Sequence, residues 1–486
     1  MRNLMESRLL RDSLLLLITM VLLFNIFDLR DDHNWGDDFS AYIGQAEAIV
    51  KNDTEYFSQV SENRVLFSDT QVGPNLYPWG YPLLLAPVIF FFGIKIIPLK
   101  IATFLFFAGS LCIIYFLFKK YLTKIVSLFL VLLVASSPFF FTFKQNVLSD
   151  IPAMFFLLLS LLLIQKIYFE KIETNKNSLL IALGISMFFS VFIRTSSAII
   201  LPTLFLVQAI NYKRCFKNLL SICQNIAPYL VFLILYLFFE IILPSGSYTK
   251  NHTLFSSSIL AQVIANTQYY ANVSAVFFGN SQNKLTWFFY LTSIPFFMFG
   301  VITNFKKNYL FLIYIFFTLG LFLTYPYLQG LRFLISLIPL YLFFVALGFN
   351  ALGFNGKLRP TFSGFTYIIC LLLLVYFLNS DLALFGNKTS KASPYAKGAQ
   401  ELFRYIESNT KETDSVAFFK PRAMHLFTKR MSIRIDTVDF LEKNQPDYYV
   451  FADIANSQEM KKYLDSTTQA VFTNTAFSVY HIDKQK

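Results

Sequence analysis

The stretch Trp35–Tyr42, WGDDFSAY, follows the first apolar run of the chain, Leu14–Phe27, and contains two adjacent carboxylates, Asp37 and Asp38. If that run crosses a membrane, the carboxylates lie at the bilayer surface, where charged groups are costly unless they serve a function. The apolar positions after Asp38 recur at helical spacing, which predicts a helix that begins at the carboxylates. A helix N-terminus favours an ionised carboxylate, as a general base or a cation ligand requires. The pair is equally compatible with a helix cap and an interfacial charge.

The composition argues against a soluble globular protein. Of 486 residues, 55% are hydrophobic and only 14% are charged, and the mean hydropathy is +0.53. The apolar residues form runs of roughly 17 to 25 residues, the length at which a helix crosses about 30 Å of hydrocarbon. The net charge of +12 comes mostly from Lys and Arg in short loops between these runs, a pattern that sets membrane orientation. The sequence therefore predicts a polytopic α-helical membrane protein without a nucleic-acid partner.

The first apolar run and the cysteines place further limits on the chain. Leu14–Phe27 follows three arginines and precedes no small-residue cleavage pattern, so we expect an uncleaved signal anchor with a cytoplasmic N-terminus. The four cysteines, Cys112, Cys215, Cys223 and Cys370, lie in or beside apolar runs without metal-ligand spacing. Neither a disulfide framework nor a zinc site is indicated.

The short apolar run Tyr81–Phe92 decides the predicted topology. It contains two prolines, whereas the next run, Ile96–Phe118, is long enough to span by itself. If both runs spanned, the later basic loops would all lie outside, but if Tyr81–Phe92 is interfacial or re-entrant, five basic loops are cytoplasmic. The second choice predicts about eleven spans, approximately at residues 12–29, 96–118, 125–143, 151–170, 178–193, 196–212, 219–243, 285–304, 309–325, 331–350 and 361–380.

Two long loops lie on the predicted outer side. The first outer loop, residues 30–95, contains a disordered-looking stretch from Asn52 to Pro74. A second long outer loop, Pro244–Lys284, contains Tyr248, His252, Tyr269 and Tyr270 but no motif with an evident function.

The composition changes after residue 380, which divides the chain into a membrane domain, residues 1–380, and a small α/β domain, residues 381–486, on the outer side. Helices are predicted at Tyr395–Asn409 and Gln458–Leu464. Strands are predicted at Val416–Phe419, Met431–Val438, Tyr448–Phe451, Ala470–Thr473 and Phe477–Ile482. The basic segment Lys420–Arg430 could bind an anionic acceptor or headgroup, but it is more typical of a solvated face.

Five charged residues from separate segments lie at predicted outer membrane edges: Asp37, Asp38, Asp150, Arg194 and Arg332. Arginine binds phosphate through two parallel donors, and a carboxylate can take a proton from a hydroxyl, so this set suits a lipid phosphate substrate. Asp150 could instead cap a helix, and Arg194 could snorkel to the interface. The three carboxylates could also converge on a divalent ion, but no metal cluster or phosphate loop is visible. We therefore expect neither a metal nor a cofactor.

Five motifs occur in an order that resembles the glycosyltransferase C (GT-C) superfamily. They are GDDFSAY, YPWGYPLLLAP, NVLSDIPAMFFLLLSL, FIRTSSAIILP and YLQGLRFLISLIPLYLFF, between Leu14 and Asn350. The likeness is to bacterial relatives of protein O-mannosyltransferases and of the lipid A aminoarabinose transferase. The resemblance implies Asp37 as the catalytic base with Asp38 beside it, Asp150 as the second acidic residue, and Arg332 as the donor-phosphate ligand. Phe333 stands where that family has the tyrosine of an Arg-Tyr pair.

The resemblance also implies a function, written here as an expectation. The protein would transfer a hexosyl or pentosyl group from a polyprenyl-phosphate donor to an extracytoplasmic glycan, lipid or protein, with inversion, at a bacterial inner membrane. Arg194 is a second candidate ligand of the lipid phosphate. Two alternatives stay open: a flippase or transporter of polyprenyl-linked glycans, and an O-antigen-type polymerase or ligase. A transporter would need ionisable residues near the bilayer midplane and paired repeats, neither of which is detectable.

Overall fold

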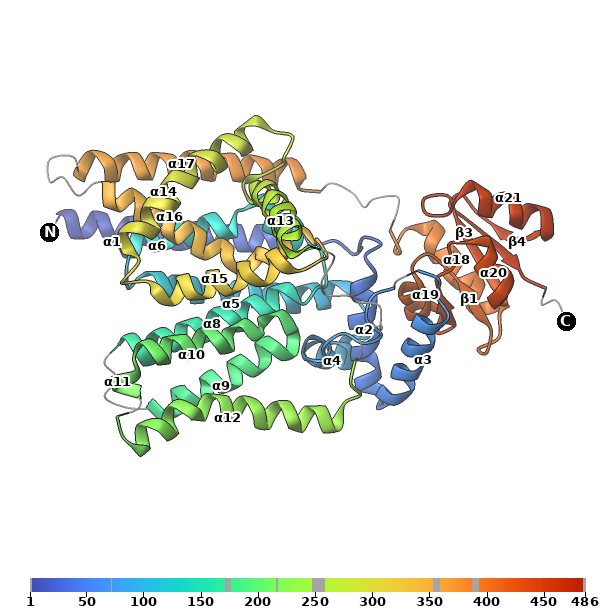
Figure 1. Ribbon diagram of the computed structural model, residues 1–486. Coiled ribbons are helices and arrows are strands. Elements are labelled where there is room, and N and C mark those ends of the chain that lie inside the picture. Colours follow the sequence, from blue (N-terminus) through green and yellow to red (C-terminus); the bar gives the residue numbers. More distant parts are fainter. Residues whose placement is uncertain are drawn as a thin grey trace.

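The computed structural model describes residues 2–70, 72–170, 176–215, 217–246, 258–352, 359–386 and 393–483. Long helices run side by side in one bundle, and a small domain with a sheet lies beyond one end of it (Figure 1). The chain begins at the opposite end of the bundle. This arrangement confirms the predicted fold class, an α-helical membrane domain with a C-terminal α/β domain.

Seven segments of the described chain are long and apolar enough to cross a membrane, so the protein is an integral membrane protein. They lie in α1 (Arg2–Phe27), α5 (Ile96–Phe118), α8 (Asp150–Phe169), α9 (Lys176–Ile193), α12 (Leu219–Ile242), α14 (Lys284–Asn304), and the 3₁₀ helix η3 (Gly330–Leu337) continued by α16 (Ile338–Leu352). Shorter helices occupy three of the other predicted spans: α6 (Lys124–Ala135) with α7 (Pro138–Phe143), η1 (Thr195–Ile199) with α10 (Ile200–Ile210), and α15 (Tyr309–Thr324). The last predicted span corresponds to α17 (Arg359–Leu384), in which Ile368–Leu384 is an apolar segment.

The first outer loop contains three helices, α2 (Asp37–Lys51), α3 (Thr54–Leu66) and α4 (Gly80–Phe92), which lie together at the end of the bundle nearest the small domain (Figure 1). The 13 residues of α4 reach about 20 Å, less than the roughly 30 Å of a hydrocarbon core. Its length and its place beside α2 agree with the interfacial or re-entrant interpretation. A Cβ atom on Gly80 would lie 2.5 Å from the carbonyl oxygen of Phe192, so only glycine lets α4 approach the end of α9 this closely.

One prediction about the outer loops is wrong. The stretch from Asn52 to Pro74 contains α3, because Phe57 and Val60 on one side of this helix are buried. The loop Pro244–Lys284 contains α13 (Ile259–Val273) and η2 (Ser274–Phe278). A different loop, which is basic and lies at the bundle end far from the small domain, contains the short helix α11 (Tyr212–Cys215) (Figure 1). Tyr248, His252, Lys171 and Lys357 lie outside the described residues.

The small domain has a five-stranded sheet in the order β2-β1-β3-β5-β4. Its strands are β1 (Ser415–Ala417), β2 (Met431–Ile433), β3 (Tyr448–Ala452), β4 (Ala470–Thr473) and β5 (Phe477–His481), of which β1 pairs in parallel with β2 and β3, and β5 is antiparallel to β3 and β4. Each predicted strand and both predicted helices, α18 (Lys397–Asn409) and α21 (Gln458–Thr467), are present. Two short helices were missed: α19 (Pro421–Thr428) and α20 (Val438–Asn444). The predicted boundary at residue 380 falls inside α17.

The basic segment Lys420–Arg430 is not a solvated face. Its helix α19 packs against α2 of the membrane domain, and Arg422 and Arg430 are only 4% and 7% exposed. Arg430 donates to the backbone carbonyls of Glu407 and Thr410, so it stabilises the small domain itself. Arg422 reaches the membrane domain.

Candidate active site

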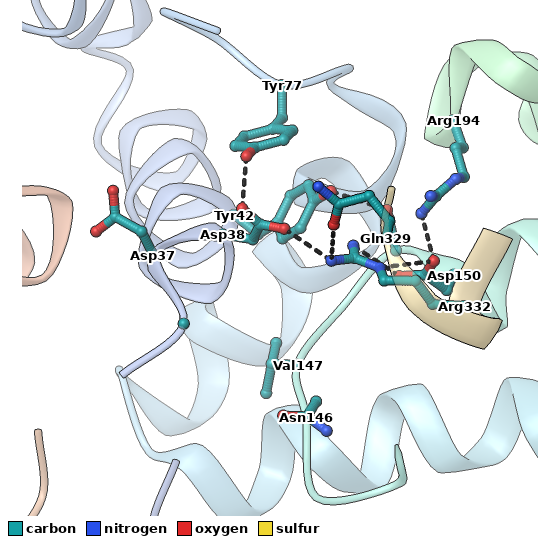
Figure 2. Close-up of polar contacts among 12 residues, drawn as sticks. Asp37, Asp38, Tyr42, Tyr77, Asn146, Val147, Asp150, Arg194, Gln329 and Arg332 are labelled. Atoms are coloured by element: carbon teal, nitrogen blue, oxygen red, sulfur yellow. Dashed lines mark hydrogen bonds and ion pairs between the residues drawn. The ribbon is translucent and has the colours of Figure 1, made fainter. Parts of the chain in front are cut away.

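Asp37 and Asp38 begin α2, as the sequence predicts, but their side chains point in different directions. Gly36 is the N-cap residue, so the free N–H groups of the first helical turn lie beside both carboxylates. Successive residues of an α-helix project about 100° apart, because 3.6 residues make one turn. Asp38 therefore faces the ends of the membrane helices, whereas Asp37 points away from them, toward Arg422 of the small domain (Figure 2).

Arg332, in η3, joins two carboxylates from distant segments. Its Nη1 donates to Oδ2 of Asp38 over 3.2 Å, and its Nε and Nη2 donate to the two oxygens of Asp150 over 3.2 and 3.0 Å (Figure 2). The contact with Asp150 is the planar two-donor geometry that arginine forms with a carboxylate and lysine does not. Gln329 accepts a longer bond of 3.4 Å from the same Nη1.

Asp150 is the first residue of α8 and is only 1% exposed. No side chain caps this helix, so Asp150 does not take the alternative role of a cap. Its Oδ1 accepts a hydrogen bond from Nη1 of Arg194 over 2.5 Å, and Arg194 therefore turns inward instead of snorkelling outward. The structure thus connects Asp38, Asp150, Arg194 and Arg332, while Asp37 stays outside this cluster.

Tyr77 is a member of the cluster that sequence reasoning did not assign. Its hydroxyl donates to Oδ1 of Asp38 over 2.6 Å, and its backbone N–H and carbonyl are both bonded to the side chain of Gln45 on α2. Burial opposes ionisation of Asp38, but the charge of Arg332 and the Tyr77 hydroxyl outweigh it and lower the pKa of Asp38 below its ordinary value. Asp38 is therefore ionised at neutral pH. The signal for Tyr77 was the motif YPWGYP, which begins at this residue.

A cavity of about 620 Å³ opens over the cluster. Asp37 and Asp38 line it together with five basic side chains, Arg194, Arg332, Lys420, Arg422 and Arg434, so its charge suits an anionic ligand. Phe333 also lines it, and the guanidinium of Arg194 lies 5.2 Å from the centre of the Phe333 ring. At Phe333 this wall offers a ring face without a hydroxyl.

Comparisons with known proteins test the likeness inferred from the motifs. No protein-family model and no curated protein sequence matches the chain. Among solved structures, ArnT of Cupriavidus metallidurans in the apo state has a TM-score of 0.58 at 11% identity, covering 97% of this chain and 98% of that one. The chain has the glycosyltransferase C fold.

Two further structures agree with this result. ArnT bound to undecaprenyl phosphate has a TM-score of 0.59 at 10% identity, covering 96% of this chain and 98% of that one. The archaeal oligosaccharyltransferase AglB of Archaeoglobus fulgidus, in complex with an inhibitory peptide and a dolichol-phosphate, has a TM-score of 0.56 at 11% identity and covers 90% of this chain and 69% of that one. The predicted resemblance to the GT-C superfamily is thereby confirmed for the fold.

The small domain supplies part of the cavity wall. Nη1 of Arg422 donates to the Tyr77 hydroxyl over 3.2 Å, and the guanidinium lies 5.0 Å from the centre of the Tyr77 ring. Its Nε is 3.8 Å from Oδ2 of Asp37, whose other oxygen is buried without a hydrogen-bond partner among the described residues. Burial raises the pKa of Asp37, although Arg422, Lys420 and Arg64 oppose the shift. Arg422 thus contacts the phenol that orients Asp38.

The described part of the chain contains no group of three His, Cys, Asp or Glu side chains that could hold a metal ion. Asp150 is engaged by two guanidiniums and Asp38 by one, so the positive charge that a cation would supply is already present there. Metal independence stays a prediction.

Proposed function

We propose that the protein is a membrane glycosyltransferase that transfers a sugar from a polyprenyl-phosphate donor to the hydroxyl of an extracytoplasmic acceptor. The observation that supports this best is the cluster in which Arg332 joins Asp38 to Asp150 beside Arg194, under a basic cavity at one end of the helical bundle. Proteins with this fold have been solved with undecaprenyl phosphate and with a dolichol-phosphate. A guanidinium pair is suited to the phosphate of such a lipid.

In the proposed reaction, Asp38 accepts the proton of the acceptor hydroxyl as its oxygen attacks the anomeric carbon. The bond from that carbon to the phosphate oxygen breaks, and the electron pair leaves with polyprenyl phosphate. The guanidinium of Arg194, which makes a single hydrogen bond in the described structure, and the remaining N–H donor of Arg332 stabilise the charge on the departing phosphate. In-line attack of this kind inverts the anomeric configuration.

Geometry favours Asp38 over its neighbour as the general base. A base must lie within hydrogen-bond reach of the proton that it removes, and this condition comes before its pKa. Asp38 faces the guanidinium cluster where the donor phosphate would lie, whereas Asp37 points away from it (Figure 2). The nearest basic group to Asp37 is Arg422, 3.8 Å away. We therefore assign the base to Asp38 and give Asp37 a supporting electrostatic role at the wall formed by the small domain.

Purified protein in detergent provides the test, because a flippase has no measurable product where no compartments exist. We expect the protein to convert polyprenyl-phosphate sugar to polyprenyl phosphate when an acceptor is supplied, measured by chromatography of the lipid products. If no polyprenyl phosphate is released across a panel of donor sugars and hydroxyl acceptors, while vesicles show lipid movement, the protein is a transporter.

We also propose that the cluster faces away from the cytoplasm of a bacterial inner membrane, with the N-terminus inside and the small domain outside. The basic loop that contains α11 lies at the bundle end opposite the small domain (Figure 1), and short basic loops stay cytoplasmic. Alkaline phosphatase fused after Lys486 is therefore expected to be active in a Gram-negative periplasm. A fluorescent reporter that matures only in the cytoplasm is expected to be dark at that position, and the reverse pair of results contradicts the orientation.

A further inference from the structure

A second cavity lies between α2, α3 and α19. Its volume is about 240 Å³, and Arg422 forms part of its wall as well as part of the larger cavity. Each helix presents one face to it, through residues such as Gly44 and Glu47 on α2, Phe57 and Arg64 on α3, and His425 on α19. The sequence alone suggested anion binding only for the basic segment Lys420–Arg430, and it predicted neither α3 nor α19.

Arg64 is buried here without a counterion. Its side chain is 2% exposed, yet its Nε and Nη2 have no hydrogen-bond partner in the described structure. Its one hydrogen bond, from Nη1 to Oγ of Ser61, is 3.4 Å long, and no described carboxylate lies within ion-pair distance. A buried charge without a partner is strongly unfavourable, so a group with this environment is expected to receive a partner from outside the chain.

The neighbouring carboxylates compensate Arg64 only in part, because Asp37 attracts it without forming an ion pair with it. Glu47 is shared by Lys51 at 2.7 Å and Lys429 at 2.5 Å, and Asp37 lies nearer to Arg422. Two further carboxylates, Asp53 and Glu412, line the cavity without pairing with Arg64. Burial and the charge of Arg422 lower the pKa of Arg64 to about 9 against the attraction of Asp37, and burial lowers the pKa of His425 to about 3. At neutral pH the arginine is therefore charged and the histidine is neutral.

We propose that this cavity binds an oxyanion, of the phosphate, sulfate or carboxylate type, through the guanidinium of Arg64. The cavity is smaller than the roughly 300 to 1,000 Å³ of pockets that hold drug-sized ligands, so it suits a single charged group on a small molecule or a headgroup. The exposed side chains of Lys51 and Lys429 stand at its mouth, where positive charge attracts anions. The site uses neither Asp38 nor Arg332, so it is separate from the proposed transfer reaction.

The test measures the melting temperature of the detergent-purified protein as inorganic phosphate is added. All proteins compared carry Arg332→Gln, which removes one of the two guanidiniums of the proposed lipid-phosphate site, so that any phosphate binding left at Arg194 is common to all of them. Because a ligand that binds the folded state stabilises it, phosphate is expected to raise Tm in this background. Adding Arg64→Gln is expected to abolish that rise, whereas adding Arg404→Gln, which removes an exposed guanidinium from α18, is expected to leave it intact.

Arg64→Gln also predicts a shift in the absence of phosphate, because it removes an uncompensated buried charge. Tm without phosphate is expected to rise in this variant. A lower Tm, or a variant that does not fold, would show that Arg64 is a structural residue that reaches Asp37 through water, and would overturn the proposal. An equal phosphate response in all three proteins would reveal a general salt effect and would also overturn it.

Nanodiscs identify the source of the anion. If the ligand is a soluble anion, the phosphate response occurs equally in discs of phosphatidylcholine and of phosphatidylglycerol. If a lipid headgroup occupies the cavity, the response occurs in phosphatidylcholine discs and is lost in discs of anionic phosphatidylglycerol. Both results support the site. The release of polyprenyl phosphate by the wild-type protein tests the proposed transfer reaction separately. Its outcome does not depend on whether the anion site exists.

Discussion

Asp38→Asn is expected to lower the release of polyprenyl phosphate by about 10²- to 10⁴-fold, the range typical of a lost general base. The amide keeps the size of Asp38 and can still bond to Tyr77, but it cannot accept the proton of the acceptor hydroxyl. Donor binding, measured as retention of labelled polyprenyl-phosphate sugar, is expected to persist, because Asp150 still holds Arg332 through two hydrogen bonds. The readout is the initial rate of lipid release in detergent.

Asp37→Asn is the matched control for this variant. It makes the same chemical change one residue away, on the side of α2 that faces Arg422, and is expected to cost less than Asp38→Asn. If the larger loss instead follows Asp37→Asn, the base is the residue that the motif suggested, and the acceptor must approach from the side of the small domain. Equal rates for wild type and both variants would show that neither Asp37 nor Asp38 is the general base.

The two carboxylates show what sequence patterns predict well and what they do not. Hydropathy places Asp37, Asp38, Asp150, Arg194 and Arg332 at the ends of apolar segments, because a charged residue there interrupts an apolar run. Which of two adjacent carboxylates faces the site depends on helical phase, and an uncertainty of one residue in the start of α2 rotates the assignment by about 100°. The pairing of Arg332 with both Asp38 and Asp150 is a property of tertiary structure alone.

The residues that the small domain contributes were not predictable for a related reason. The strands of this domain alternate in a recognisable pattern. In contrast, α19 has only eight residues, and its basic composition suggests an exposed segment although Ala423 and Met424 are buried. A buried arginine such as Arg422 looks like a surface arginine in sequence, since its partner Tyr77 lies in another domain. The same is true of Arg64, whose environment depends on three helices.

Arg332→Lys is expected to lower the rate of lipid release by roughly 10- to 150-fold, although the positive charge remains. The loss corresponds to about 1.5 to 3 kcal/mol, the contribution of hydrogen bonds to charged groups. Lysine presents one compact ammonium, so it cannot reproduce two parallel donors to Asp150 and a third to Asp38 while also facing the lipid phosphate. The measurement is the rate at limiting and at saturating donor.

Arg434→Lys provides the control, since Arg434 lines the same cavity but pairs with Asp436 of its own domain. It is expected to keep nearly normal rates, because its contact lies outside the cluster around Asp150. A comparable loss in both variants would indicate that the cavity needs only arginine-type charge, without a defined geometry. Near-normal turnover by Arg332→Lys at limiting donor would show that the hydrogen bonds from the guanidinium to Asp38 and Asp150 are not needed for the reaction. The phosphate ligand would then have to be Arg194.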